Sequence, residues 1–167
     1  MAKLDHVLLL GNPRLYELSR PVTDEEMPDI KPVINDLRDI LVEFKELYNA
    51  GRGIAAPQIG ILKRVIFLNL EEPHALINPI LFDKSDEMVE IWDDCMCFPM
   101  LEVKVLRHAS CKVRFRDRYW QEHVWDLKDG MAELLQHESD HLDGILATQR
   151  AIDDRSFRWK KASPPSS

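Results

Sequence analysis

Two histidines four residues apart, near the C-terminus, constrain this chain more than any other feature. They are His137 and His141, and Glu138 directly follows the first, in a His-Glu-x-x-His pattern. On an α-helix, residues four apart lie on one face, so both imidazoles can reach one metal ion. Glu138 lies about 100° further round the helix, where it is a poor third ligand but can act as a general base. The pattern therefore predicts a hydrolytic metal centre.

The alternative is that these are ordinary helix residues, with the histidines partly buried and the glutamate in solvent. The neighbouring sequence argues against this alternative, because the same helix is apolar enough to lie in the protein interior. Buried polar side chains without partners are costly, so two histidines and a glutamate in such a helix need partners. The apolar residues that support this argument are Met131, Leu134, Leu135, Leu142 and Ile145.

Length and composition fit one soluble domain with a substantial core. The chain has 167 residues, of which 45% are hydrophobic and 31% charged, and its net charge is −7. That charge argues against binding to nucleic acid or to an anionic membrane surface. No apolar run approaches the ~20 residues that span a bilayer, and the N-terminus lacks a signal-peptide layout. We expect a cytoplasmic protein without nucleic-acid or membrane partners.

The N-terminal half contains one long helical pattern and one loop of small residues. Apolar residues recur at three- and four-residue steps from about residue 29 to 49, which predicts a long amphipathic helix. The run 51–58 then reads GRGIAAPQ. Its glycines allow close backbone approach, and Gln58 is an isolated amide among small apolar residues. This loop is either a tight connection or a place where Gln58 meets a substrate oxygen.

The middle of the chain is rich in predicted strands. Short extended segments are expected over 64–70, 77–82, 88–92, 102–106 and 111–116, with a turn at 119–122 and a return strand at 123–125. Cys111 falls on the apolar face of its strand and is expected in the core. Nothing divides the chain, so we expect a single domain over residues 1–150. Residues 151–167 form a C-terminal extension, whose last five residues are expected to be disordered.

A catalytic centre usually has three protein ligands, so a third ligand is needed besides the two histidines. Cys95 and Cys97 follow a predicted strand in the run 93–99, DDCMCFP. A thiolate binds borderline and soft metals well. Residue chemistry alone does not choose between these two cysteines.

Three segments in this order resemble the peptide deformylase family. They are GRGIAAPQ at 51–58, the Cys95 loop, and QHESDHLDG at 136–144. The resemblance covers roughly residues 6–150. It implies an α+β fold with antiparallel sheets packed around the helix that carries the histidine motif. It implies removal of the formyl group from the N-terminal formyl-methionine of nascent polypeptides, with the ribosome as a place of encounter.

The resemblance also implies roles for single residues. The metal ligands become Cys95, His137 and His141, and Glu138 becomes the general base. One divalent ion is implied, with Fe(II) as the native metal and zinc, nickel or cobalt able to replace it. The Gln58 amide and the Met96 backbone N–H become oxyanion donors. The positions that contact substrate become Gly53, Ile54, Asp94 and Leu134.

The middle motif departs from the family. The usual run is EGCLS, but residues 93–97 here are DDCMC, so Asp94 replaces a glycine and Cys97 a serine. Glu102 stands near a position that is often arginine. Arg107 matches a basic family position and is predicted to pair with Asp140 or Asp93. An acidic mouth, formed by Asp94 and Glu102, would favour basic residues after the methionine.

Three other functions remain open from the sequence. A divergent enzyme on this scaffold could hydrolyse another formyl or acyl amide. A general metalloprotease also uses His-Glu-x-x-His, although the segments around Gln58 and Cys95 argue against it. A non-catalytic protein could hold a structural metal, and Cys97 as a fourth ligand would favour that alternative.

Overall fold

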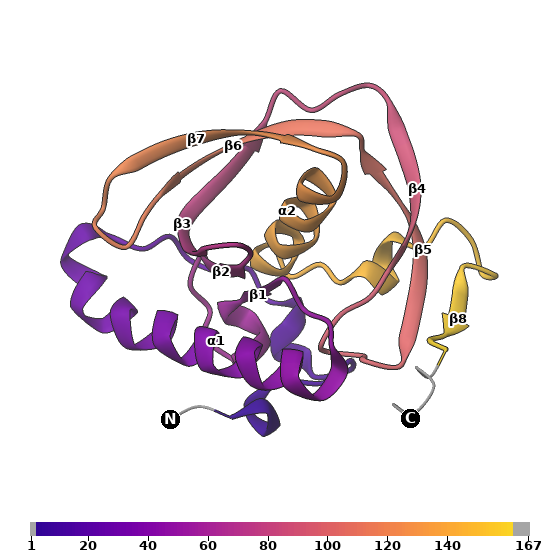
Figure 1. Ribbon diagram of the computed structural model, residues 1–167, viewed down its shortest axis with the longest axis horizontal. Helices are drawn as coiled ribbons and strands as arrows, with labels where there is room; N and C mark the ends of the chain where they lie inside the picture. The colour runs from indigo at the N-terminus through magenta and orange to yellow at the C-terminus, as the bar shows by residue number, and fades with distance from the viewer. Residues whose placement is uncertain (1–2, 162–167) are drawn as a thin grey trace.

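The computed structural model describes residues 3–161, so the disorder predicted for 163–167 lies outside the described residues. Two antiparallel sheets lie around a buried helix (Figure 1). The first sheet has the order β1-β2-β3-β6-β7 and the second β4-β5-β8. The strands are β1 (Gly53–Ala55), β2 (Val65–Asn69), β3 (Pro73–Phe82), β4 (Met88–Asp93), β5 (Leu101–His108), β6 (Ser110–Arg116), β7 (Glu122–Lys128) and β8 (Phe157–Trp159).

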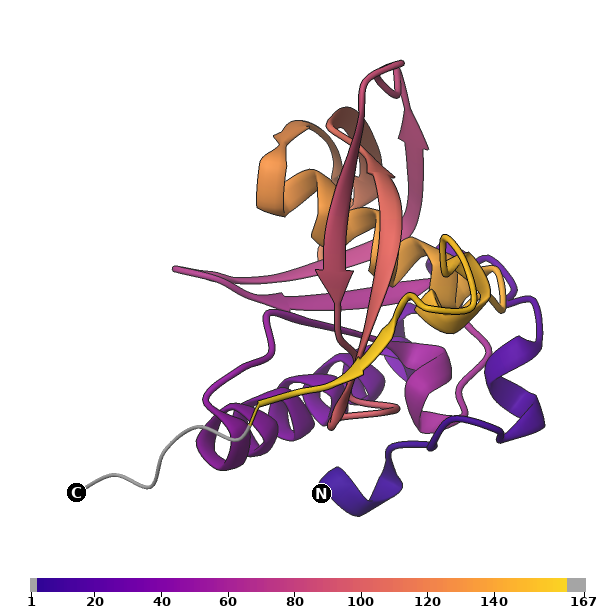
Figure 2. The same cartoon turned by 90° about the vertical axis from the view of Figure 1, so that its right-hand side faces the viewer.

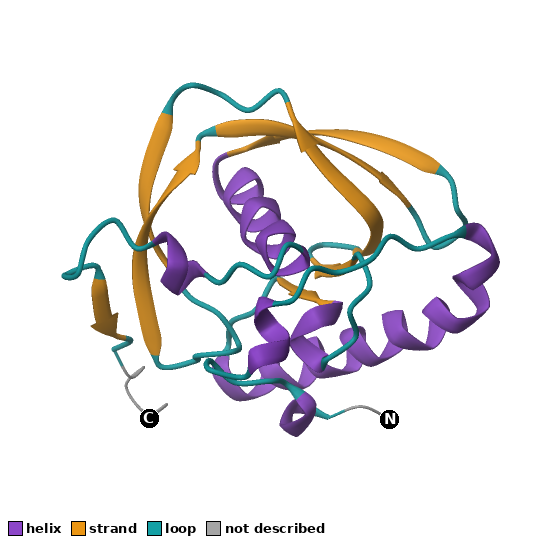
Figure 3. Cartoon of the chain, turned by 180° about the vertical axis from the view of Figure 1, so that it is seen from behind, coloured by secondary structure: helices purple, strands orange, loops and turns teal. Residues whose placement is uncertain are grey.

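The two α-helices occupy different layers. Helix α2 (Asp129–Leu142) lies inside the curve of the sheets, and α1 (Met27–Tyr48) crosses the opposite side of the molecule (Figures 1 and 3). Short 3₁₀ helices complete the chain: η1 (Leu4–His6), η2 (Pro13–Tyr16), η3 (Asp24–Glu26), η4 (Ala56–Ile59) and η5 (Ala147–Arg150). The architecture is thus α+β with antiparallel sheets and a C-terminal helix.

Helix α1 buries one apolar stripe, as its three- and four-residue periodicity requires. Its buried side chains run from Met27 to Phe44, whereas Leu47 and Tyr48 at its end are 66% and 43% exposed. The apolar pattern in the sequence includes both of these residues, but the packed part of the helix ends before them. Asn49 then takes a left-handed conformation with φ 49° and turns the chain.

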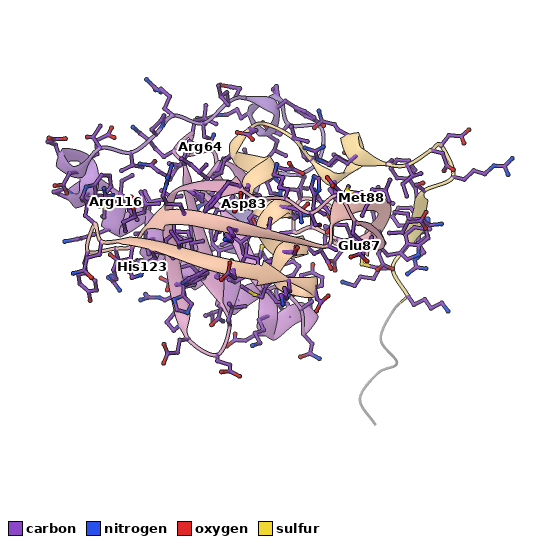
Figure 4. All side chains as sticks on the ribbon, turned by 90° about the horizontal axis from the view of Figure 1, so that it is seen from above. Arg64, Asp83, Glu87, Met88, Arg116 and His123 are labelled. Atoms are coloured by element: carbon purple, nitrogen blue, oxygen red, sulfur yellow. The ribbon has the colours of Figure 1, made fainter. Side chains whose placement is uncertain are left out.

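The core has two parts, and β1, β2 and β3 contribute alternate residues to each of them. One part contains the α1 stripe, which contacts β1 and β2, together with residues of the loop 95–98 and of β5. The other packs the inner faces of β2, β3, β6 and β7 against α2, and it includes Cys111, which confirms the prediction that this cysteine is a core residue. Figure 4 shows β6 and β7 lying over α2 when the molecule is seen from above. Helix α2 is therefore covered on several sides, and its residues 134–142 are all buried.

The beginning of the C-terminal extension is part of the second sheet. Strand β8 pairs with β5, with Leu101 opposite Trp159 and Glu102 opposite Arg158. Figure 2 shows β8 running beside β5 towards the C-terminus. The sequence patterns do not predict this strand. Within residues 3–161, no helix is long and apolar enough to cross a membrane.

Candidate metal centre

Helix α2 presents the two histidines of the motif towards the loop after β4. A sulfur or nitrogen atom from each of Cys95, His137 and His141 lies within 4.8 Å of the corresponding atoms of the other two. The Cys95 Sγ lies 3.3 Å from His141 Nε2. All three side chains are at most 7% exposed. Cys97 is not a member of this cluster of described residues, so the structure distinguishes two cysteines that residue chemistry could not.

A buried chain of ion pairs orients His137. Its Nδ1 lies 2.9 Å from Asp93 Oδ2, and the same oxygen accepts a 2.8 Å hydrogen bond from Arg107 Nη2. The other end of that guanidinium, Nη1, donates to Asp140 Oδ2 at 2.6 Å. Arg107 therefore pairs with both of the acids that were predicted as alternatives. Because Nδ1 of His137 faces a carboxylate, its Nε2 is the nitrogen left for a metal.

Charge and burial act against each other in this chain of residues. Burial opposes the ionisation of Asp93, but the charges of His137 and Arg107 hold the pKa of Asp93 well below its usual range. For His137, burial alone would lower the pKa, and Asp93 instead raises it to about 9. Burial is also the main reason that the pKa of the Cys95 thiol is raised. A divalent cation would favour the deprotonated thiol and the neutral imidazole over these protonated forms.

Glu138 lies beside the ligand cluster and is almost fully buried. It is 3% exposed, and its Oε2 has no hydrogen-bond partner among the described residues. Burial raises the pKa of Glu138 to about 7. A Cβ on Gly53 of β1 would lie 3.2 Å from both Cγ and Oε1 of Glu138. A side chain at position 53 would crowd both this carboxylate and Leu68, so glycine allows the strand to approach closely.

Gln58 is held from its oxygen side. The Ala55 backbone N–H donates to Gln58 Oε1 at 2.8 Å, which fixes the orientation of the carboxamide within η4. The Nε2 atom then faces two sulfurs, at 3.5 Å from Cys95 Sγ and 3.6 Å from Cys97 Sγ. The amide therefore points its donor group into the metal centre. Cys97 contacts this donor rather than joining the ligand cluster.

A cleft of about 320 Å³ opens onto these groups. The site residues predicted from the sequence that line it are Gly53, Gln58, Asp94, Cys95, Met96, Leu134, His137 and Glu138. His141 and Ile54 do not line it. His141 is buried next to Cys95, and the Ile54 side chain is fully buried in the core. The cleft is also lined by residues that were not predicted as site residues: Phe44, Ala50, Gly51, Arg52, Asp93 and Glu133.

The residues present fit a catalytic divalent ion. One sulfur and two nitrogens form a donor set suited to zinc, iron and similar metals. Cys95 and His137 line the cleft, so a metal held by them would be open to a substrate there. The described residues offer three ligands to this site and no fourth, which would leave one coordination position free. A structural site would instead be closed by four ligands.

Comparison with known proteins identifies a family for this chain. A sequence profile described as polypeptide deformylase matches residues 4–156. Peptide deformylase 1 of Prochlorococcus marinus (strain MIT 9313) is 34% identical over 165 residues, covering 90% of this chain and 82% of that protein.

The chain belongs to the peptide deformylase family.

Solved structures of other family members have the same fold. The peptide deformylase of Synechococcus elongatus, in complex with actinonin, superposes with a TM-score of 0.81 at 25% identity, covering 89% of this chain and 79% of that one. The peptide deformylase of Thermus thermophilus gives 0.78 at 32% identity, covering 86% and 84%. Peptide deformylases are metal-dependent hydrolases that act on nascent formyl-methionyl peptides, and this family function is the function of the chain.

Proposed function

We propose that Cys95, His137 and His141 hold the catalytic metal of this deformylase and that Glu138 is its general base. The observation that supports this proposal most directly is the three-ligand cluster, of which Cys95 and His137 line the cleft together with Glu138. Iron(II) is the native metal in this proposal, and zinc, nickel or cobalt can replace it. When bound, such an ion acts as a Lewis acid and makes water more acidic.

Glu138 moves the proton in this mechanism. Its carboxylate accepts a proton from the water that attacks the formyl carbon, and it then gives that proton to the departing amine. The C–N bond breaks, formate leaves, and the peptide keeps a free amino terminus. Burial raises the pKa of Glu138 to about 7, and the charge of a divalent ion beside it would favour the carboxylate form that accepts the proton.

Gln58 and Met96 stabilise the charge that develops on the formyl oxygen. The carboxamide of Gln58 is pre-oriented by its bond from Ala55 N–H, so no reorganisation is needed when the charge appears. Met96 lines the same cleft beside Cys95, and its backbone N–H is the second donor in this proposal. Gly53, Asp94 and Leu134 border the cleft and contact the peptide.

The direct test is formate release from formyl-Met-Ala-Ser by protein purified without oxygen and loaded with iron(II). Glu138→Ala should retain metal and fold and lose nearly all activity. A variant with full activity would remove Glu138 as the base. A metal-loaded wild-type protein that releases no formate would favour another formyl or acyl amide as the substrate. We place the reaction in the cytoplasm, on chains emerging from the ribosome.

A further inference from the structure

The mouth of the cleft carries an acid that the C-terminal strand neutralises. Asp94 lines the cleft, and the Lys160 ammonium, which follows β8, forms an ion pair with its carboxylate. The two side chains are 49% and 32% exposed, so the pair lies at the boundary between cleft and solvent. From the sequence, Asp94 is expected to make this mouth acidic. The cation that offsets it comes from 66 residues further along the chain.

Backbone pairing fixes the position of Lys160. Its N–H donates to the Met100 carbonyl at 2.7 Å, directly after the β5–β8 ladder. Within that ladder, Arg158 Nε lies 3.1 Å from Glu102 Oε1, and the guanidinium stacks 3.9 Å from the centre of the Trp92 ring. Strand β8 is therefore anchored by hydrogen bonds, an ion pair and a cation–π contact, and it presents Lys160 to Asp94.

Glu102, which was expected at this mouth, does not line the cleft, and the second acid at the mouth is Glu133, which is paired as well. Glu133 lines the cleft, and its Oε1 lies 3.8 Å from Arg52 Nη2, also a cleft residue. Each of Asp94 and Glu133 thus has its own cation. Of these two cations, only Lys160 comes from the C-terminal segment, and removing its charge would leave Asp94 as an unpaired negative charge at the rim.

We propose that Lys160 is a specificity-determining residue, which masks Asp94 so that the enzyme accepts peptides with acidic as well as basic residues after formyl-methionine. This inference rests on the proposed function, because a formyl group placed at Glu138 directs the rest of the peptide outward past Asp94. Exposed charges about 6 Å apart in water interact enough to change binding roughly threefold. A lysine peptide and a glutamate peptide change in opposite directions, so the ratio of their affinities changes about tenfold.

The test compares kcat/KM for formyl peptides with Lys, Gln or Glu at the second or the third position, at low salt. Lys160→Gln should raise the Lys-to-Glu ratio about tenfold at one of these positions, and the effect should shrink at high salt, about 0.5 M. Asp94→Asn should shift the ratio in the opposite direction. The double variant should return close to the wild-type ratio, since the two opposite shifts cancel when both charges are removed. Lys161→Gln removes the same charge one residue away and should change the ratio less than about twofold.

Equal Lys-to-Glu ratios for Lys160→Gln and Lys161→Gln would overturn the proposal, as would a double variant that keeps the ratio of Lys160→Gln. Binding of the same peptides by calorimetry, in a Glu138→Ala background, gives the ratio without turnover. A wild-type protein that releases no formate would contradict the proposed function. If Lys160→Gln leaves the Lys-to-Glu ratio of binding constants unchanged in the Glu138→Ala background, the role of Lys160 is contradicted and the proposed function is not affected.

Discussion

At the residue scale, Glu138 combines a chemical role with a cost to folding. Its carboxylate is buried, and one of its oxygens has no partner among the described residues. An ionised carboxylate in such a place destabilises the folded state relative to an unfolded chain in water. The close approach of Gly53 maintains this environment, since any side chain there would contact the carboxylate.

This cost predicts a pH-dependent gain in stability for Glu138→Gln in the metal-free protein. The folded pKa of about 7 lies above the unfolded value of about 4.3, so the wild-type protein loses stability as pH rises through that interval. Glutamine is neutral throughout. The variant should match the wild type near pH 4 and be about 1–3 kcal/mol more stable near pH 8 by urea unfolding. A difference that does not vary with pH would show that Glu138 is not held with a raised pKa.

Residue patterns predicted part of the site and not the rest. The spacing of His137 and His141 is local, because a helix alone places both imidazoles on one face. The choice between Cys95 and Cys97 depends on how the loop after β4 meets α2, which residue chemistry does not reveal. Arg52 and Glu133 reach the cleft only because β1 and α2 pack together, so no local pattern marked them.

At the element scale, α1 stabilises the domain through one buried stripe. Leu37 is fully buried in the middle of this stripe, and Leu47 near the helix end is 66% exposed. Both are leucines in the same helix, so they provide a matched pair for testing packing.

Leu37→Ala should lower the free energy of unfolding by about 2–5 kcal/mol, because it removes buried methyl groups and leaves a cavity. Leu47→Ala should change it by less than about 0.5 kcal/mol, as expected for a surface substitution. Chemical denaturation of both variants checks the prediction. Similar losses at the two positions would mean that the helix packs differently.

Strand β8 was not predicted, because its sequence pattern is very short. The three residues of β8 give too few positions for alternation, and Arg158 suggests a solvent-exposed tail rather than a strand. Its pairing is set by the edge of β5, far away in sequence. The long α1 pattern was predicted within about two residues at each end, because about six turns of periodicity outweigh uncertainty at the caps.

At the scale of the whole molecule, Arg107 joins three elements. From β5 it binds Asp93 at the end of β4 and Asp140 on α2, and Arg150 of η5 donates two further hydrogen bonds to Asp140. The Arg107 side chain is 3% exposed. This network connects the second sheet to the helix that carries the metal ligands.

Arg107→Met should destabilise the protein by about 3–5 kcal/mol at neutral pH, because it removes the guanidinium from the buried Asp93 and leaves Asp140 with Arg150 as its one remaining partner. The pKa of Asp93 is held below its usual range, so its stabilising contribution exists above pH ~4 and is lost as pH falls. The difference in free energy of unfolding between Arg107→Met and the wild type should therefore become smaller at acidic pH. Arg38→Met removes a half-exposed arginine paired with Asp39 and should cost less than about 1 kcal/mol. Unfolding curves that differ equally in acid and at neutral pH would contradict the role of the ion pairs.

The central claim is that Cys95, rather than Cys97, completes the metal site with His137 and His141. The most direct measurement is the absorption spectrum of the cobalt(II)-loaded protein, in which a thiolate ligand produces a charge-transfer band in the near ultraviolet. We predict this band in the wild type and in Cys97→Ser, and its loss in Cys95→Ser. A band that persists in Cys95→Ser and disappears in Cys97→Ser would contradict the account.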